Sequence, residues 1–176
     1  MIRVVTGCMF SGKSTKLIGI ALYLKNKNIQ VFKPKIDTRD NGILKSRNRD
    51  ISFEATLIEN LEEIPQKLKE NVKIIIIDEA QFLKGDISTI VNLHLKGYDF
   101  IVAGLNLTSE RKPFGIMKDF LSVATKVEVL YAKCAICGEE KAIYTKYLGK
   151  EKNKDVIVSD DYYPICRKCL KEVENI

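Results

Sequence analysis

The sequence predicts an α/β fold with a parallel central sheet and a small C-terminal addition. Short runs of β-branched residues alternate with amphipathic stretches, which is the pattern of strands joined by crossover helices. A glycine-containing turn follows the first of these runs directly, and four of the five cysteines come after residue 131. At 176 residues the chain has room for one ordinary domain and a small second one, which we place at 1–131 and 132–176.

The elements of the first domain follow in order. Strands are expected where β-branched and other apolar residues cluster, at 2–6, 29–33, 52–58, 72–77, 100–103 and 127–131. Helices are expected where apolar residues recur every three or four positions, at 13–25, 86–96 and 116–124. The run 72–77 is apolar on both faces and should be a central strand, and 127–131 should be the last strand of the core. The polar segment 37–50 has no periodicity and is expected to be a mobile loop.

Composition and charge exclude several classes of protein. With 45% hydrophobic and 30% charged residues, the chain is globular rather than collagen-like or disordered. Its longest apolar run is far shorter than the roughly 20 residues that span a bilayer, and its first residues do not resemble a secretion signal. We therefore expect a cytoplasmic protein with no membrane partner. The net charge of +6 suits nucleic acid or another polyanionic ligand, and it also fits a solvated surface.

The turn after the first strand carries a phosphate-binding motif. Gly7-Cys8-Met9-Phe10-Ser11-Gly12-Lys13-Ser14 fits the pattern G-x-x-x-x-G-K-[ST] between a strand and a helix. Its glycines allow successive backbone N–H groups to face phosphate oxygens, and the helix N-terminus adds partial positive charge. Lys13 is expected to meet the β- and γ-phosphates, and Ser14 to ligate Mg²⁺. The expected phosphate-binding residues are Gly7, Met9, Phe10, Ser11, Gly12, Lys13, Ser14 and Thr15.

Two acidic residues end the predicted central strand. Asp78 can hold a metal-bound water beside the phosphates, as the carboxylate of the second nucleotide-binding motif does. Glu79 can accept the proton of an attacking nucleophile. That nucleophile would be water in an ATPase and a substrate hydroxyl in a kinase, and the spacing does not separate the two.

The cysteines of the second domain form two pairs with zinc-site spacing. Cys134 and Cys137 make the first pair, and Cys166 and Cys169 the second. Four thiolates from two such turns give a closed tetrahedral site, which is structural because no position stays open for a substrate. Disulfides are the alternative, and a chain without a secretion signal disfavours them. Cys8 is unpaired and is expected to be a small packing residue.

Together with four further segments, these motifs resemble one family. The segments are Val31-Phe32-Lys33-Pro34 with Asp37-Thr38-Arg39, Ile77-Asp78-Glu79-Ala80-Gln81-Phe82, Arg111-Lys112-Pro113-Phe114-Gly115, and Tyr144-Thr145-Lys146 with Tyr162. They stand in the order found in the zinc-containing thymidine kinases shared by bacteria and animal cytosol, and the resemblance covers essentially the whole chain. It implies a RecA-like P-loop domain joined to a small zinc domain, whose lasso-type loop at 146–161 closes over the nucleoside.

The resemblance also implies an activity and residue roles. The family transfers the γ-phosphate of ATP to the 5′-hydroxyl of thymidine or deoxyuridine with Mg²⁺, in nucleotide salvage for DNA synthesis, and is commonly a homotetramer. By this resemblance Glu79 is the general base, Arg39 helps to bind or stabilise the transferred phosphate, and Ser14 and Asp78 serve the magnesium ion. The implied nucleoside pocket consists of Met9, Phe82, Leu105, Thr145 and Tyr162.

The chain departs from the family pattern at three places. Asn106 and Ser109 stand where the family usually carries an Asp and an aromatic residue, and the usual glycines are missing from 46–49 and from around 159–160. Phosphotransfer is therefore matched better than thymidine as the acceptor. The alternatives are a nucleoside kinase with another acceptor, an inactive paralogue, and a zinc-ribbon P-loop ATPase acting on nucleic acid. The last is disfavoured because the basic residues are scattered among acidic ones.

Overall fold

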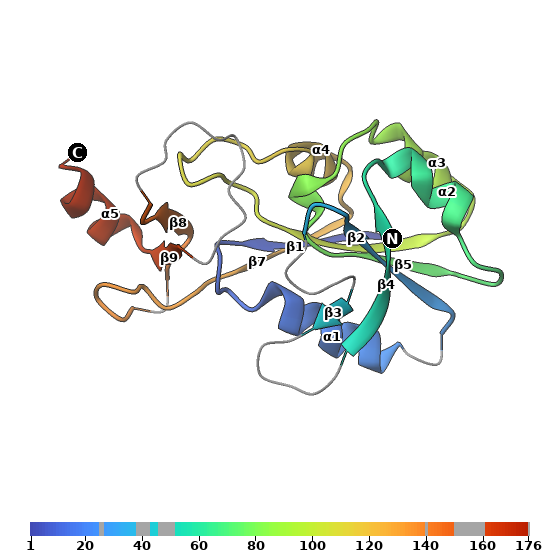
Figure 1. The fold of residues 1–176 in the computed structure, drawn as a ribbon, viewed down its shortest axis with the longest axis horizontal. Helices are drawn as coiled ribbons and strands as arrows, with labels where there is room; N and C mark the ends of the chain where they lie inside the picture. The colour runs from blue at the N-terminus through green and yellow to red at the C-terminus, as the bar shows by residue number, and fades with distance from the viewer. Residues whose placement is uncertain (25–26, 38–42, 46–51, 140, 150–160, 176) are drawn as a thin grey trace.

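A seven-stranded sheet covered by helices on both faces forms the larger part of the protein (Figure 1). The computed structural model describes residues 1–24, 27–37, 43–45, 52–139, 141–149 and 161–175. The strands of the sheet are β1 (Ile2–Gly7), β2 (Ile29–Pro34), β3 (Ile43–Lys45), β4 (Ser52–Ile58), β5 (Ile74–Ile77), β6 (Asp99–Gly104) and β7 (Lys126–Leu130). Their spatial order is β3-β4-β2-β5-β6-β1-β7. All neighbours are parallel except β3 and β4, so the predicted parallel sheet is confirmed.

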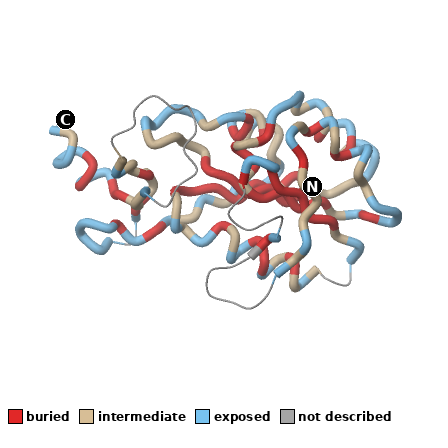
Figure 2. Tube along the Cα trace, viewed as in Figure 1, coloured by how far each residue is buried: buried red, intermediate tan, exposed pale blue. Residues whose placement is uncertain are grey.

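The strand β5 lies in the middle of this sheet, as its apolar sequence predicts. Ile75 and Ile77 belong to the core on one face, and Ile76 to the core on the other. All three side chains are fully buried. Figure 2 shows the same concentration of buried residues along the central strands. Since β5 is buried on both faces, the acidic residues that follow it begin from a well-packed strand end.

Helices from different parts of the chain supply that cover. One face packs against α1 (Lys13–Tyr23), through Leu17, Ile18 and Ala21. The other packs against α3 (Ser88–Leu95), α4 (Met117–Val123) and the short segment η2 (Leu61–Glu63) with α2 (Ile64–Lys67). Among the residues that the structure describes, none of the helices has the length and apolar character needed to cross a bilayer.

One expectation about the sheet edges was wrong. Three residues of the segment 37–50 form β3, which pairs antiparallel with β4 and buries Leu44 completely. Two apolar residues within a polar segment are too few to show a period, and most of the remaining segment lies outside the described residues. The strand expected at 127–131 is present as β7, the last strand of the large sheet in chain order, and it lies at an edge of the sheet. Val127 and Val129, two positions apart and so on the same face of β7, are about half exposed.

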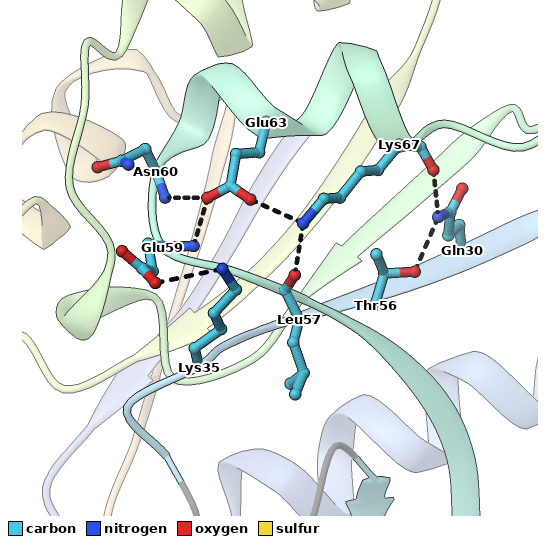
Figure 3. A network of polar contacts seen from close by, with 8 residues as sticks. All are labelled: Gln30, Lys35, Thr56, Leu57, Glu59, Asn60, Glu63 and Lys67. Atoms are coloured by element: carbon cyan, nitrogen blue, oxygen red, sulfur yellow. Dashed lines mark hydrogen bonds and ion pairs between the residues drawn. The ribbon is translucent and has the colours of Figure 1, made fainter.

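A polar network fastens η2 and α2 to the sheet (Figure 3). Asn60 and Glu63 form a capping box, and Glu63 Oε1 accepts from the backbone N–H groups of Glu59 at 2.7 Å and Asn60 at 3.0 Å. Lys67 Nζ donates to Glu63 Oε2 at 2.7 Å and to the carbonyl of Leu57 at 3.0 Å. No periodic signal in the sequence indicates these two short helices, because one turn contains too few apolar positions.

A second, smaller sheet follows the first. It pairs β8 (Tyr144–Tyr147) with β9 (Tyr162–Ile165) in antiparallel register, and the helix α5 (Arg167–Glu174) comes next. Its core is a separate cluster of buried residues, Cys8, Ala132, Cys134, Ala142, Ile165, Cys166, Cys169 and Leu170. Cys8 is the one member that comes from the phosphate loop, so this cluster touches the large sheet at the end of β1.

Candidate active site

The phosphate loop joins the end of β1 to the start of α1. Gly12 has φ 84° directly before the helix, and a Cβ at Gly7 would lie 2.2 Å from the carbonyl oxygen of Leu130, so neither position suits a side chain. Lys13 Nζ donates to the carbonyl oxygens of Gly7 at 3.1 Å and Cys8 at 2.8 Å. The loop thus curls around a buried ammonium group, and the helix N-terminus opens beside it. This arrangement is suited to a phosphate chain.

Asp78 meets the phosphate loop across the sheet end. Its backbone N–H continues the ladder by donating to the carbonyl of Phe32 at 3.1 Å, and Ser14 Oγ donates to its Oδ2 at 3.3 Å. Burial, and after it the charge of Glu79, raises the pKa of Asp78 to about 7, although the nearby charges of Lys33 and Lys13 lower it. A hydroxyl and a buried carboxylate together are a donor set that fits Mg²⁺, because hard cations prefer oxygen ligands and would offset the burial of the charge.

Glu79 follows Asp78 in a left-handed backbone conformation, with φ 51° and ψ 38°. Such a conformation costs energy for a residue other than glycine and is typical of functional sites. It turns the chain sharply out of the strand and leaves the carboxylate half-buried at the sheet end. Glu79 Oε2 accepts from Gln81 Nε2 at 2.5 Å. A carboxylate held beside a phosphate loop can take a proton from a bound nucleophile.

A buried ion pair supports the same end of the sheet. Lys33 Nζ lies 3.1 Å from Asp37 Oδ2, and both side chains are only 1% exposed. Lys33 also donates to the carbonyl of Ile43 at 3.2 Å, which ties β3 to the end of β2. Its charge lowers the pKa of Asp78, so it contributes to the field around the acidic pair. Arg39, the predicted phosphate residue two positions after Asp37, lies outside the described residues.

The structure brings predicted nucleoside residues together in two groups. Met9 donates its backbone N–H to Thr145 Oγ1 at 3.0 Å, which brings the phosphate loop against β8. Leu105 donates its backbone N–H to Gln81 Oε1 at 3.0 Å, next to Phe82 in η3 (Ala80–Phe82).

Two aromatic ring contacts involve residues of the candidate site, one at Tyr162 and one between Phe82 and Phe114. Tyr162 lies in β9, beside β8, with its ring 4.9 Å from that of Tyr147. The rings of Phe82 and Phe114 pack edge to face, with centroids 5.5 Å apart. Phe114 donates its backbone N–H to the carbonyl of Asn106, so the turn between them returns an aromatic ring to Phe82 despite Ser109 at the usual aromatic position.

Two residues of this site were not assigned roles from the sequence. Gln81 contacts both Glu79 and Leu105, and Phe114 contacts Phe82. Both stand inside motifs already quoted for the family resemblance. A polar residue two positions after an acidic strand end was the available signal for Gln81, but only the folded chain shows which groups its amide reaches.

The four cysteines of the C-terminal region form one cluster. Their sulfur atoms all lie within 4.8 Å of one another, and Cys137 Sγ is 3.8 Å from Cys166 Sγ. Tetrahedral zinc with bonds of about 2.3 Å places its sulfur ligands about 3.8 Å apart, so the arrangement fits structural zinc. All five cysteines belong to the described residues, and all five carry free thiols. Gly138, at φ 77°, allows the tight turn after the first pair.

The protonation of these thiols also suits a metal. Burial opposes ionisation of Cys134, but hydrogen bonds from the backbone N–H groups of Cys137, Cys166 and Ile136 outweigh it and lower its pKa to about 6. Burial and the neighbouring thiols raise the pKa of Cys169 to about 12. A metal ion favours the thiolate of every ligand and would resolve this contrast.

Cys8 has the packing role predicted for it. It is buried in the C-terminal cluster, and its Sγ donates to the carbonyl of Ala142 at 3.2 Å. Burial raises the pKa of this thiol, so it stays protonated and unreactive at neutral pH. With the contact between Met9 and Thr145, this bond gives the phosphate loop two direct links to the cysteine-bearing region.

Comparison with known proteins agrees with this geometry. A family model described as thymidine kinase matches residues 1–170. The thymidine kinase of Mycoplasma mobile is 36% identical over an alignment of 183 positions, which covers 99% of this chain and 88% of the relative. Those of Mycoplasma genitalium and Pseudothermotoga lettingae are 34% and 30% identical, over 90% and 98% of this chain and 76% and 95% of the relatives. The chain belongs to the thymidine kinase family.

Proposed function

We propose that the protein transfers the γ-phosphate of ATP to the 5′-hydroxyl of thymidine, and of deoxyuridine, in a magnesium-dependent reaction of nucleotide salvage. The observation that carries this proposal is the contact of Ser14 Oγ with Asp78 Oδ2 at 3.3 Å, which joins the two nucleotide motifs directly beside Glu79. Membership of the thymidine kinase family supports thymidine as the acceptor.

The phosphate loop and the acidic residues after β5 have separate roles at the triphosphate. The backbone N–H groups of the loop bind the phosphate oxygens, and Lys13 balances their charge. Ser14 and Asp78 would hold Mg²⁺, which neutralises charge on the transferred group when bound. Arg39 is proposed to add a second cation at the transferred phosphate. Glu79 accepts the proton of the 5′-hydroxyl as that oxygen attacks phosphorus and the bond to the leaving ADP oxygen breaks.

The nucleoside is proposed to bind between the two sheets. Met9 and Thr145 are in direct contact there, and Leu105 and Phe82 approach from the ends of β6 and β5. Phe82 and its partner Phe114 can offer aromatic surface to a pyrimidine, and Tyr162 lines the side of β9.

The C-terminal region is proposed to act as a zinc-stapled domain. The ligands would be Cys134, Cys137, Cys166 and Cys169, and zinc supplies four bonds that close the base of the loop between β8 and β9. We place the domain boundary at residues 131 and 132. The buried clusters support this division, because the two large ones use residues before 132 and the third uses residues after it, with Cys8 as the exception.

We also propose a cytoplasmic homotetramer. ATP as phosphate donor and five free thiols suit a reducing compartment. The exposed edge strand β7 presents Val127 and Val129, with Tyr131 just beyond it, and apolar side chains on an unpaired edge are suited to contact with another copy. Light scattering should give about four times the chain mass of 20.0 kDa, and a monomer would contradict the assignment.

A panel of acceptors tests the activity. The protein is incubated with labelled ATP, Mg²⁺ and each nucleoside in turn, and we expect label on thymidine and deoxyuridine. Label on another nucleoside alone would indicate a kinase with an altered acceptor, as Ser109 suggests. ATP turnover that rises with single-stranded DNA, without any labelled nucleoside, would contradict the proposal. Glu79→Gln should lower kcat roughly 10²- to 10⁴-fold with ATP binding retained, and an active variant would mean that another group takes the proton.

A further inference from the structure

A single buried amide connects the acidic strand end to the neighbouring strand. Gln81 is 3% exposed and lies in η3, two residues after Glu79. Its Nε2 donates to Glu79 Oε2 at 2.5 Å, and its Oε1 accepts from the backbone N–H of Leu105 at 3.0 Å. The amide therefore joins the carboxylate after β5 to the first residue after β6.

Hydrogen-bond chemistry determines the orientation of this amide. A backbone N–H can only donate, so Leu105 requires the carbonyl oxygen of Gln81. The amino group is then left to face Glu79, whose carboxylate oxygens accept. A hydrogen bond to a charged acceptor is shorter and stronger than a neutral one, so the contact can hold the carboxylate in one place.

The surrounding backbone has left space for Gln81. A Cβ at Gly104 would lie 2.8 Å from Gln81 Oε1, and a Cβ at Gly115 would lie 2.1 Å from the backbone oxygen of Gln81. Gly115 also has φ 50°, which disfavours other residues. Two separate chain segments thus approach Gln81 closely only because they carry glycine there.

Glu79 needs such a support. Its left-handed backbone is strained, and conformations of this kind persist only where the surrounding contacts determine them. A general base must be held close to its productive position, since small displacements cost large factors in rate. Leu105 and Phe82, the two neighbours of this amide, are the proposed pocket residues from β6 and η3.

We infer that Gln81 is a positioning residue, which fixes the Glu79 carboxylate relative to the wall of the nucleoside pocket formed by Leu105 and Phe82. The inference rests on the proposed function, because it gives Gln81 its role through Glu79 as general base. Gln81 acts by holding the base, and the proton transfer itself belongs to Glu79.

The test compares kinetics in two backgrounds. Gln81→Met keeps the length of the side chain but removes both hydrogen bonds, and we expect kcat with thymidine to fall about 10- to 100-fold while KM for ATP changes less than about twofold. In the Glu79→Gln background the same substitution should cost less than about threefold, because the group that Gln81 positions is already missing.

Gln30 supplies the matched control. It is also a buried glutamine, 5% exposed, with an amide that bonds Thr56 Oγ1 at 3.0 Å and the carbonyl of Lys67 at 2.9 Å (Figure 3). It lies at the start of β2, whereas the site lies at the strand ends. Gln30→Met should lower the melting temperature at least as much as Gln81→Met but leave kcat within about twofold of the wild type.

Three results would overturn the inference. These are a kcat of Gln81→Met within about threefold of the wild type, an equal loss in both backgrounds, and an equal loss of kcat in Gln30→Met. If Gln81→Met does not fold, Gln81→Asn replaces it, since the shorter amide cannot span Glu79 and Leu105. A wild type that phosphorylates no nucleoside refutes the proposed function, whereas an active wild type with an unaffected Gln81 variant refutes only the role of Gln81.

Discussion

The large sheet and the cysteine-bearing region are stabilised by different forces. The sheet buries large apolar side chains on both faces, among them Phe32 and Phe100 on one face and Leu17 on the other, all fully buried. Among the residues that the structure describes, the C-terminal cluster buries Ile165 and Leu170 with alanines and cysteines, and Tyr144 and Tyr163 pack against it partly buried. Burial of that size cannot offset the entropy of ordering two strands and a helix. We therefore expect the large sheet to fold by apolar burial and the C-terminal region to depend on a metal at its four cysteines.

The two regions meet at the phosphate loop. The links are the bond of Cys8 Sγ to the carbonyl of Ala142 and that of the Met9 N–H to Thr145 Oγ1. A change in the C-terminal region can therefore reach residues on the ATP side of the site. Zinc is expected to support both substrates, with the nucleoside affected more strongly because β8 and β9 carry Thr145 and Tyr162.

Loss of the metal should have the largest effect on the stability and kinetics of the protein. Apparent zinc binding to small structural sites is worth about 10 to 16 kcal/mol, and without it such regions unfold. Chelation, or Cys166→Ser, should release zinc and raise KM for thymidine more than KM for ATP. The thermal transition of the large sheet should remain, because its core does not include the ligands. Metal analysis, calorimetry and steady-state kinetics measure these three quantities.

Cys8→Ser is the matched control for metal content. Cys8 is buried in the same cluster but is not one of the four cysteines whose sulfur atoms converge. Its variant should retain one zinc per chain. Unchanged zinc content in Cys166→Ser would remove the assignment of the site, and loss of the whole folded structure on chelation would show that the two regions are not separately stabilised.

A smaller effect tests the link between the regions. Thr145→Val leaves the N–H of Met9 without its acceptor, which costs about 1 to 3 kcal/mol when the group is buried. We expect kcat/KM for ATP to fall about tenfold, because the phosphate loop loses a fixed point. Thr145 is also a proposed nucleoside residue, so the ATP kinetics at saturating thymidine are the decisive measurement.

Thr125 offers the corresponding contact away from the site. Its Oγ1 accepts from the N–H of Ile2 at 3.0 Å and donates to the carbonyl of the same residue at 3.1 Å, at the opposite end of β1. Thr125→Val should lower stability without changing the kinetics for ATP. Equal kinetic effects of the two variants would mean that the link at Thr145 transmits nothing specific.

The strands of the large sheet differ in how far they could be predicted from the sequence. The strand at 2–6 follows from a run of β-branched residues, and β4 has the predicted bounds 52–58. Burial on both faces made the central place of β5 readable. The edges were harder, because β3 has three residues and because the alternation of β7 shows one apolar face without showing whether another element covers it.

The residues of the site also divide into those that the sequence predicts and those that only the folded chain reveals. The phosphate loop, Asp78 and the cysteine pairs could be located because their chemistry requires fixed spacing along the chain. The contacts of Gln81 with Leu105 and of Met9 with Thr145 could not, since their partners are 24 and 136 positions apart. The role of Arg39 stays a prediction, as its position lies outside the described residues.

The smallest expected effect concerns the polar contacts of Glu63 in the large-sheet region, which contribute far less to stability than the metal should. The hydrogen bond of Glu63 with Lys67, and those that it accepts from the backbone N–H groups of Glu59 and Asn60, lower the pKa of Glu63 to about 2 (Figure 3). A lowered folded-state pKa stabilises the protein at pH values above the unfolded value of 4.5, and this is lost as the pH falls from there to about 2. Glu63→Gln should therefore lower the free energy of unfolding by about 0.5 to 1 kcal/mol at pH 7 in urea, with the difference from wild type vanishing near pH 2. Glu59→Gln is the control, because it loses only an exposed ion pair with Lys35 and should leave the free energy of unfolding unchanged. An equal loss of stability in both variants, or a difference between Glu63→Gln and wild type that persists in acid, would refute the capping role of Glu63.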